Sequence, residues 1–164
     1  MTFTLREYEP ADFETLWQVD QDCFSAGIAY SRRELMTYIA RRNSFTLVAE
    51  EAGGNGATRE SSGILGFITA DAGWGRVGHI ITIDVVEKAR RSGVGSSLLE
   101  AAEQQLRNMG CDLVGLETAV DNPGAFAFYK RHGYFLVKMV PHYYATGVDA
   151  FVLKKSLRLP VSTE

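Results

Sequence analysis

The sequence has no run of about 18 consecutive apolar residues, the minimum length of a helix that crosses a membrane. Its first residues, MTFTLREYEPADFE, contain no apolar segment behind a basic start, so a secretory signal is not predicted either. Cysteine is scarce: Cys23 and Cys111 stand far apart, without a Cys-x-x-Cys or histidine spacing typical of metal ligands. We therefore predict a cytoplasmic protein with reduced core thiols, no membrane partner and no metal.

An excess of basic residues is also absent. Lysine and arginine number 17 against 20 aspartates and glutamates, which gives a net charge of -3. A chain with this charge has no electrostatic reason to bind nucleic acid or an anionic membrane. The 164 residues are 46% hydrophobic and 23% charged, as expected for a folded protein of ordinary domain size. We predict a single domain over residues 1–164.

A strand, a glycine-rich turn and a helix are predicted in succession between Gly78 and Ala102. A short continuous run of mostly β-branched residues is typical of a central strand: Ile80, Ile81, Ile83, Val85 and Val86. Apolar residues then recur at the spacing of a helix with one buried stripe: Leu98, Leu99, Ala102, Leu106 and Met109. The predicted exposed face of the same helix carries Glu100, Glu103, Gln104 and Arg107.

The turn between that strand and helix has the composition of a phosphate-binding loop. Gly93 and Gly95 let a ligand approach the backbone, and the N–H groups at a helix start attract anions. The chain has no G-x-x-x-x-G-K-[ST] string, and Leu98 stands where a dinucleotide-binding fingerprint needs its third glycine. The pattern R-x-x-G-x-G, which begins at Arg90, instead resembles the pyrophosphate-binding signature of the GNAT superfamily of acetyl-CoA-dependent N-acetyltransferases.

A second motif follows the first at a suitable distance. Residues 122–134, NPGAFAFYKRHGY, are similar to the N-x-x-A-x-x-F/L-Y-x-x-x-G-F/Y motif of the same superfamily. Because two independent motifs occur in the correct order, separated by a helix and a strand, the chain is identified as a member. The resemblance implies acetyl-CoA as cosubstrate and no metal.

The order of elements along the chain agrees with this resemblance. Strands are predicted at residues 2–8, 45–49, 64–69, 80–86, 113–119, 134–140 and 150–154. Helices are predicted at residues 10–24 and 31–42, from the glycine turn to Gly110, and at residues 122–132. The order βααβββαβαββ implies the GNAT fold, an α/β (α+β) architecture with a mixed, mostly antiparallel seven-stranded sheet flanked by four helices. The polar, glycine-rich residues 51–62 are expected to form a long mobile hairpin loop.

The resemblance also implies which residues hold acetyl-CoA. The pyrophosphate would contact the side chains of Arg90 and Arg91 and a series of backbone N–H groups: those of Arg91, Ser92, Gly93, Val94, Gly95 and Ser96. The pantetheine arm would pair with the main chain from Ile83 to Val85, where that strand separates from the next, and the Val85 N–H would polarise the thioester carbonyl. Asn122 is expected to bind the pantetheine, to cap its helix, or both.

Tyr129 occupies the tyrosine position of the second motif. The resemblance implies that it protonates the departing thiolate, and a phenol is suited to this role because it is protonated at neutral pH. The alternative is that Tyr129 only packs beside Phe126 and Phe128 in the core.

Glu117 is the first candidate for the general base. Its place in the strand before the tyrosine motif resembles the RimI-type ribosomal-protein-alanine N-acetyltransferases, where a glutamate in this strand is the base. The alternative is a solvated carboxylate at a strand end. His79 and His142 are rival bases because histidine titrates nearest neutrality. His132 ends a helix, where a cation complements the helix dipole, and is expected to have no further role.

Three tyrosines are predicted to line the acceptor site. Tyr30 lies between two helices on no clear core face, while Tyr143 and Tyr144 lie in a loop that resembles the substrate loop of RimI-type and Nα-terminal acetyltransferases. The alternatives are packing over the helix pair for Tyr30 and an edge-strand aromatic pair for the other two.

The predicted function is transfer of acetyl from acetyl-CoA to a primary amine by direct attack in a ternary complex. The favoured acceptor is the N-terminal α-amine of a protein or peptide. A small amine or a lysine side chain is the alternative acceptor, and a non-catalytic acyl-CoA-binding module is the alternative from a different class of protein.

Overall fold

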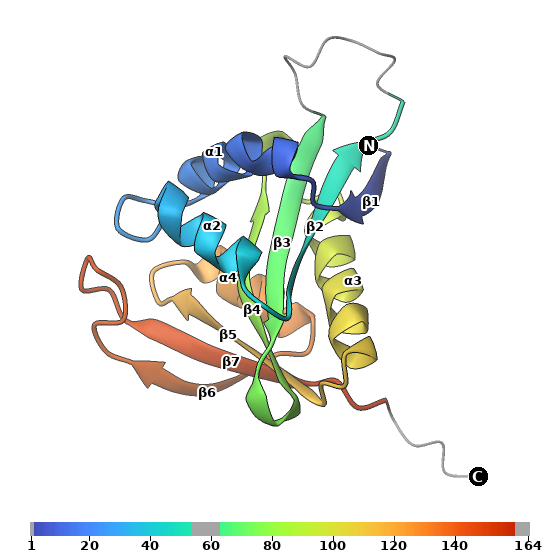
Figure 1. Cartoon of the computed structure of the whole chain (residues 1–164). Coiled ribbons are helices and arrows are strands. Elements are labelled where there is room, and N and C mark those ends of the chain that lie inside the picture. The colour runs from blue at the N-terminus through green and yellow to red at the C-terminus, as the bar shows by residue number, and fades with distance from the viewer. Residues whose placement is uncertain (1, 54–62, 160–164) are drawn as a thin grey trace.

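The computed structural model describes residues 2–53 and 63–159 (Figure 1). Within these ranges lie four α-helices: α1 (Phe13–Cys23), α2 (Arg32–Ala40), α3 (Val94–Asn108) and α4 (Pro123–Arg131). The same ranges contain seven strands: β1 (Phe3–Glu7), β2 (Ser44–Glu51), β3 (Ile64–Ala72), β4 (Val77–Val85), β5 (Leu113–Ala119), β6 (Phe135–Val140) and β7 (Ala150–Ser156). The predicted order of helices and strands is confirmed. Of the predicted loop at residues 51–62, positions 54–62 lie outside the described residues.

All seven strands belong to one sheet in the order β1-β2-β3-β4-β5-β7-β6. Neighbouring strands are antiparallel except β4 and β5, which run parallel because α3 connects them as a crossover. The predicted mixed, mostly antiparallel sheet is therefore confirmed. β4 and β5 pair only at Val77, Gly78 and His79 of β4, and beyond His79 they separate.

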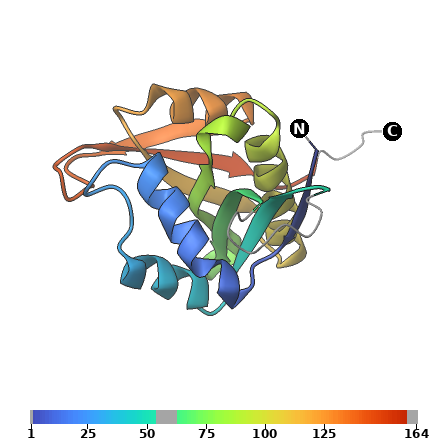
Figure 2. The ribbon, with the colours of Figure 1, turned by 90° about the horizontal axis from the view of Figure 1, so that it is seen from above.

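The helices cover the two faces of the sheet. α1 and α2 lie on one face, and α3 and α4 lie on the other (Figure 1, Figure 2). Each face has its own cluster of buried side chains: Leu16, Val19 and Leu35 pack under α1 and α2, and a larger cluster that includes Leu98 and Leu106 packs under α3. Full burial of a large apolar side chain is worth about 1.5–3 kcal/mol, so these clusters hold the layers together. No helix within residues 2–53 and 63–159 is long and apolar enough to cross a membrane.

Two helix starts follow directly from local sequence. Ser31 Oγ accepts the Glu34 N–H at 3.1 Å and Glu34 reaches back to the Ser31 N–H, which is the predicted capping box of α2. Asn122 Oδ1 accepts the Ala125 N–H at 3.1 Å, with Pro123 as the first residue of α4. Both caps satisfy backbone donors that a helix leaves without partners.

Two positions on α3 differ from the sequence prediction. Glu103, predicted on the exposed face, is only 2% exposed, whereas Met109, predicted in the buried stripe, is 41% exposed. The Glu103 carboxylate accepts the Tyr134 hydroxyl and the Lys155 ammonium, each at 2.9 Å. These two donors come from distant parts of the chain and compensate for the burial of a charge, which helical periodicity does not reveal.

β4 is the central strand of the sheet, as its β-branched run predicted. Pairing with β3 shifts by one residue at Ile81, which makes a β-bulge in β4. Before the bulge, Ile80 packs in the larger cluster under α3; after it, the buried side chains are those of Thr82 and Asp84. The bulge therefore switches the face to which alternate side chains of β4 point.

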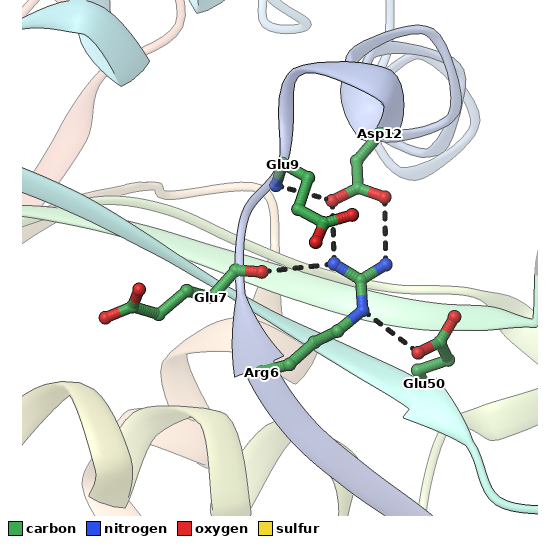
Figure 3. A network of polar contacts seen from close by, with 5 residues as sticks. All are labelled: Arg6, Glu7, Glu9, Asp12 and Glu50. Carbon is green, nitrogen blue, oxygen red and sulfur yellow. Dashed lines mark hydrogen bonds and ion pairs between the residues drawn. The ribbon is translucent and has the colours of Figure 1, made fainter.

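Arg6 connects β1 to the start of α1 (Figure 3). Its guanidinium donates to both oxygens of Asp12, at 2.8 and 2.9 Å, and its Nε donates to Glu50 at 2.9 Å. Asp12 also accepts the Glu9 N–H at 2.8 Å. The hydrogen bonds from Arg6 hold the pKa of Asp12 below its usual value, although burial acts in the opposite direction.

Replacing Asp12 with asparagine is expected to lower the free energy of unfolding near neutral pH by about 1–3 kcal/mol, because hydrogen bonds to a charged group are weakened. Since folding lowers the pKa of Asp12, its contribution is present above pH ~4 and is lost as the pH falls through the folded-state pKa. Urea unfolding near neutral pH and at about pH 3 should show a difference in the free energy of unfolding between variant and wild type that becomes smaller in acid.

Glu50→Gln is the matched control, since its carboxylate contacts the same guanidinium but is 42% exposed. A larger decrease in the free energy of unfolding for Glu50→Gln than for Asp12→Asn would contradict this account.

Candidate active site

The separation of β4 from β5 opens a cleft of about 920 Å³. Its walls come from the segment between α1 and α2, from β4 and β5, from the turn before α3, from α4 and from the loop between β6 and β7. Most predicted site residues line it: Tyr30, Ile83, Val85, Arg90, Arg91, Gly93, Gly95, Ser96, Glu117, Asn122, Tyr129, Tyr143 and Tyr144. Segments that are far apart in sequence therefore meet around one hollow.

The backbone of β4 presents hydrogen-bonding groups to this cleft. In an antiparallel pair, alternate residues bond to the partner strand, and the Val86 N–H donates to the Leu65 carbonyl of β3 at 2.9 Å. Val85 and Ile83 must therefore direct their N–H and C=O groups to the other side, from which β5 has separated. This exposed edge of β4 is the feature that an extended ligand needs for main-chain pairing.

The turn before α3 forms one end of the cleft. Gly93 has φ 90°, a left-handed conformation that favours glycine, and it gives the helix no side-chain cap. The first N–H groups of α3 therefore remain available to an anion. Two predicted residues, Ser92 and Val94, are not among those that line the cleft: the Ser92 hydroxyl bonds to the Ala89 carbonyl, and the Val94 side chain is buried in the core.

The Arg90 side chain, which was predicted to contact the pyrophosphate, is hydrogen-bonded to the backbone of β4 in the structure. Its Nε donates to the Val85 carbonyl at 3.2 Å, and its Nη2 lies 3.7 Å from Cys23 Sγ. His132, expected only to complement the dipole of α4, also contacts Ser96 Oγ through Nε2 at 3.0 Å. Both contacts fix the helix-start turn against neighbouring elements.

Tyr129 lies where α4 meets the cleft. Its side chain is 7% exposed and packs between the rings of Phe128 and Tyr134, with centroids 5.3 and 5.6 Å away. Burial raises the pKa of Tyr129, so its phenol is protonated at neutral pH. Among the described residues no hydrogen-bond partner holds its hydroxyl, which leaves the proton available to a ligand in the cleft.

His79 and Glu117 form a pair across the mouth of the separated strands. His79 of β4 lies beside Gly115 of β5, and Glu117 follows two residues later, so both side chains lie close together. His79 Nε2 and Glu117 Oε2 are 2.6 Å apart. Burial lowers the pKa of His79, but the hydrogen bond and charge of Glu117 outweigh it, and the net shift is upward.

This pair changes the sequence interpretation of the base. Glu117 and His79 were rival candidates in the sequence, whereas in the structure the Glu117 carboxylate contacts the His79 imidazole. The rival base His142 lies in the β6–β7 loop, where its Nδ1 contacts the Gly147 carbonyl at 3.2 Å, and it does not line the cleft. Of the two histidines, only His79 is in a position to act together with Glu117.

Aromatic side chains surround the opposite end of the cleft from α3. The Tyr30 and Tyr38 ring centroids are 5.2 Å apart, and those of Tyr143 and Tyr144 are 4.9 Å apart. The Tyr30 hydroxyl donates to the Ile81 carbonyl at 3.3 Å, at the β-bulge. Tyr38 was not predicted as a site residue, because its helical spacing in α2 indicated an apolar face.

Two buried aspartates beside the cleft were also missed. Asp20 of α1 is 0% exposed and Asp84 of β4 is 1% exposed. A signal was present in the sequence, since each carboxylate occupies a position that the apolar pattern of its helix or strand assigns to the core.

Comparison with known proteins identifies the family. Residues 13–134 match the model of the acetyltransferase (GNAT) family. The chain therefore belongs to the GNAT acetyltransferase family, as its two motifs predicted.

Individual relatives agree with this result. An N-alpha-acetyltransferase of Sulfurisphaera tokodaii is 33% identical over 106 residues, which are 57% of this chain and 64% of that relative. The match thus spans less than two thirds of that relative's length. An uncharacterized N-acetyltransferase of Methanocaldococcus jannaschii is 28% identical over 152 residues, 92% of this chain and 90% of the relative. The crystal structure of Ard1 from Thermoplasma volcanium is similar with a TM-score of 0.83 and 26% identity, covering 97% of this chain and all of that one.

Proposed function

We propose that this protein is an N-acetyltransferase that transfers acetyl from acetyl-CoA to the N-terminal α-amine of a protein or peptide. One observation carries the proposal: a single cleft joins a helix start without a side-chain cap, an unpaired edge of β4, a buried phenol and a histidine–glutamate pair. Relatives named N-alpha-acetyltransferases support the choice of acceptor. The RimI-like assignment, the single domain over residues 1–164 and the cytoplasmic location belong to the same proposal and rest on the sequence.

The residues at the α3 end fit the donor. Acetyl-CoA supplies a thioester, whose carbonyl carbon the amine attacks. The helix-start N–H groups and Arg91 would bind its pyrophosphate, while Ile83 and Val85 would pair with its pantetheine arm. The Val85 N–H would donate to the thioester oxygen, where negative charge develops as the amine attacks.

The proposed proton transfers involve three side chains of the cleft: His79, Glu117 and Tyr129. An α-ammonium group must lose a proton before it attacks, and the His79–Glu117 pair would accept it as one coupled unit. The C–N bond then forms, the nitrogen releases its second proton to solvent, and the C–S bond breaks. Tyr129 would give its phenolic proton to the departing thiolate and regain one from solvent.

The acceptor side favours a peptide over a small amine. Tyr143 is 48% exposed, so the aromatic end of the cleft opens to solvent and leaves room for a chain that continues beyond the reacting amine. Tyr30, Tyr143 and Tyr144 would contact the first residues of that chain. A small amine or a lysine side chain remains the second candidate acceptor, since the same proton-transfer groups would serve it.

Free-thiol release from acetyl-CoA tests the proposal. The acceptors are short peptides with different first residues, the same peptides with acetylated N-termini, polyamines and free amino acids. We expect turnover with free peptides and none with their blocked counterparts. Turnover with small amines alone would replace the peptide proposal by its alternative. Binding of acetyl-CoA without turnover on any acceptor would favour the non-catalytic module.

A further inference from the structure

Asp20 of α1 and Asp84 of β4 lie beside residues that line the cleft, among them Ile83 and Val85. Each uses one oxygen in a short hydrogen bond: Asp20 Oδ2 accepts the Tyr30 N–H, and Asp84 Oδ1 accepts the Thr82 hydroxyl, both at 2.7 Å. The other oxygen of each, Asp20 Oδ1 and Asp84 Oδ2, is buried and receives no hydrogen bond from the residues that the structure describes. α1 packs against β4, and a hydrogen bond between the two carboxyl groups is among the causes that act on both pKa values, lowering that of Asp20 and raising that of Asp84.

Two ionised carboxylates are unstable in such a place. Burial and the neighbouring negative charge both penalise the second charge, so the pair retains one proton. The pKa of Asp84 is raised well above its usual value, mainly by burial and then by Asp20. The other titratable groups that interact with the pair are Glu34, Cys23, Tyr30 and Tyr129, and none of them is a cation. The nearby cation Arg90 contacts the Val85 carbonyl and Cys23.

The donors around the pair and the bond between its members indicate which aspartate holds the proton. Asp20 accepts a backbone N–H, which can only donate, and its hydrogen bonds with Tyr30 and Asp84 both act to lower its pKa, so it is the ionised partner. The Thr82 hydroxyl beside Asp84 can also accept, and the hydrogen bond with Asp20 raises the pKa of Asp84. Asp84 accepts the Thr82 hydroxyl through Oδ1 and therefore carries the proton on Oδ2. The proton then completes a continuous chain from Thr82 through Asp84 and Asp20 to the backbone of Tyr30.

We propose that Asp20 and Asp84 share one proton and act as a positioning pair, which holds the Tyr30 segment against β4. The inference rests on the proposed function for its effect on acetyl transfer, because Tyr30 lines the acceptor end and Ile83 and Val85 flank Asp84 on the donor strand. The pair thereby connects the two substrate sites through groups that touch neither substrate.

Asparagine substitutions distinguish the two aspartates. Asp84→Asn supplies an N–H donor in place of the shared proton and keeps the carbonyl for Thr82, so the chain of hydrogen bonds is retained. Asp20→Asn replaces the ionised acceptor of the Tyr30 N–H with a neutral amide, whose NH2 group either opposes the Asp84 hydroxyl or forces the charge onto Asp84, where burial disfavours it. We expect Asp20→Asn to raise KM for the peptide by about tenfold or more, the effect of losing a hydrogen bond to a charged group, with little change in kcat. For Asp84→Asn, KM for the peptide should remain within about twofold of the wild-type value.

Amide hydrogen exchange over residues 24–30 measures the positioning without any substrate. Exchange should be about tenfold faster in Asp20→Asn and unchanged in Asp84→Asn, with α3 protected in both. Asp22→Asn, an exposed aspartate on the same helix, is the matched control and should resemble wild type. Equal effects of Asp20→Asn and Asp84→Asn on KM, or wild-type exchange in Asp20→Asn, would overturn the proposal.

Infrared spectroscopy tests the shared proton itself. The carbonyl stretch of a buried protonated carboxylic acid should be present in the wild-type protein near neutral pH and absent in Asp84→Asn. Absence of this band in wild type would overturn the proposal even if Asp20→Asn fails to fold. Because neither exchange nor infrared absorption requires turnover, failure of this inference is distinguishable from failure of the proposed acetyl transfer.

Discussion

Tyr129→Phe is expected to lower kcat by about 10²–10⁴-fold, the usual contribution of a positioned general acid. The substitution removes one hydroxyl from a ring that is 7% exposed and leaves the contacts with Phe128 and Tyr134 in place. The Kd for acetyl-CoA, measured by calorimetry, should stay within about threefold of wild type. The hydroxyl is expected to interact with the departing thiolate only in the transition state, so its removal does not weaken ground-state binding.

Tyr134→Phe is the matched control for Tyr129→Phe. It removes a buried phenol hydroxyl from the same aromatic cluster, one that bonds to Glu103 and does not line the cleft. It should reduce stability while leaving kcat near the wild-type value. An unchanged kcat in Tyr129→Phe, or an equal loss in both variants, would remove Tyr129 from the mechanism.

Glu117→Gln and His79→Gln are expected to lower kcat/KM by about 10²-fold or more each, since each removes half of the proposed base. If the two groups act as one unit, the double variant should be no slower than the worse single variant. Glu100→Gln, on the exposed face of α3, is the matched glutamate control and should leave activity unchanged. Full additivity of the two losses would show that the residues act independently.

The pH profile of Glu117→Gln provides a second readout of the same pair. Glu117 raises the pKa of His79 against the opposing effect of burial. The rate should rise with pH as His79 loses its proton, so removal of Glu117 should move this rise to lower pH. Comparison with wild type on one peptide cancels the titration of the substrate amine. A rise that stays at the wild-type pH would exclude His79 as the titrating base.

Much of the fold could be predicted because its determinants are local. The capping box at Ser31, the Asn122–Pro123 helix start and the left-handed glycines at positions 93 and 110 are each read from a few adjacent residues. The two superfamily motifs then related these elements to a known sheet order. The bulge at Ile81 was not predictable, since it depends on how β4 pairs with β3.

The sequence predicted which residues belong to the candidate site, but it did not predict which of them contact one another. Glu117 and His79 were rival bases in the sequence, and only the register of β4 against β5 makes them partners. Asp20 and Asp84 were overlooked because each is unfavourable in the core alone and tolerable only when the two meet. In both cases sequence periodicity can assign a single residue to the core, but it does not show which distant residue that side chain meets.

The most direct test of the central claim is to locate the acetyl group by fragmentation mass spectrometry. The protein is incubated with acetyl-CoA and a peptide that has a free N-terminus and one internal lysine. The account predicts a single acetyl group on the α-amine, lost in Tyr129→Phe and retained in Tyr134→Phe. Acetylation of the lysine side chain alone, or of neither amine, would contradict it.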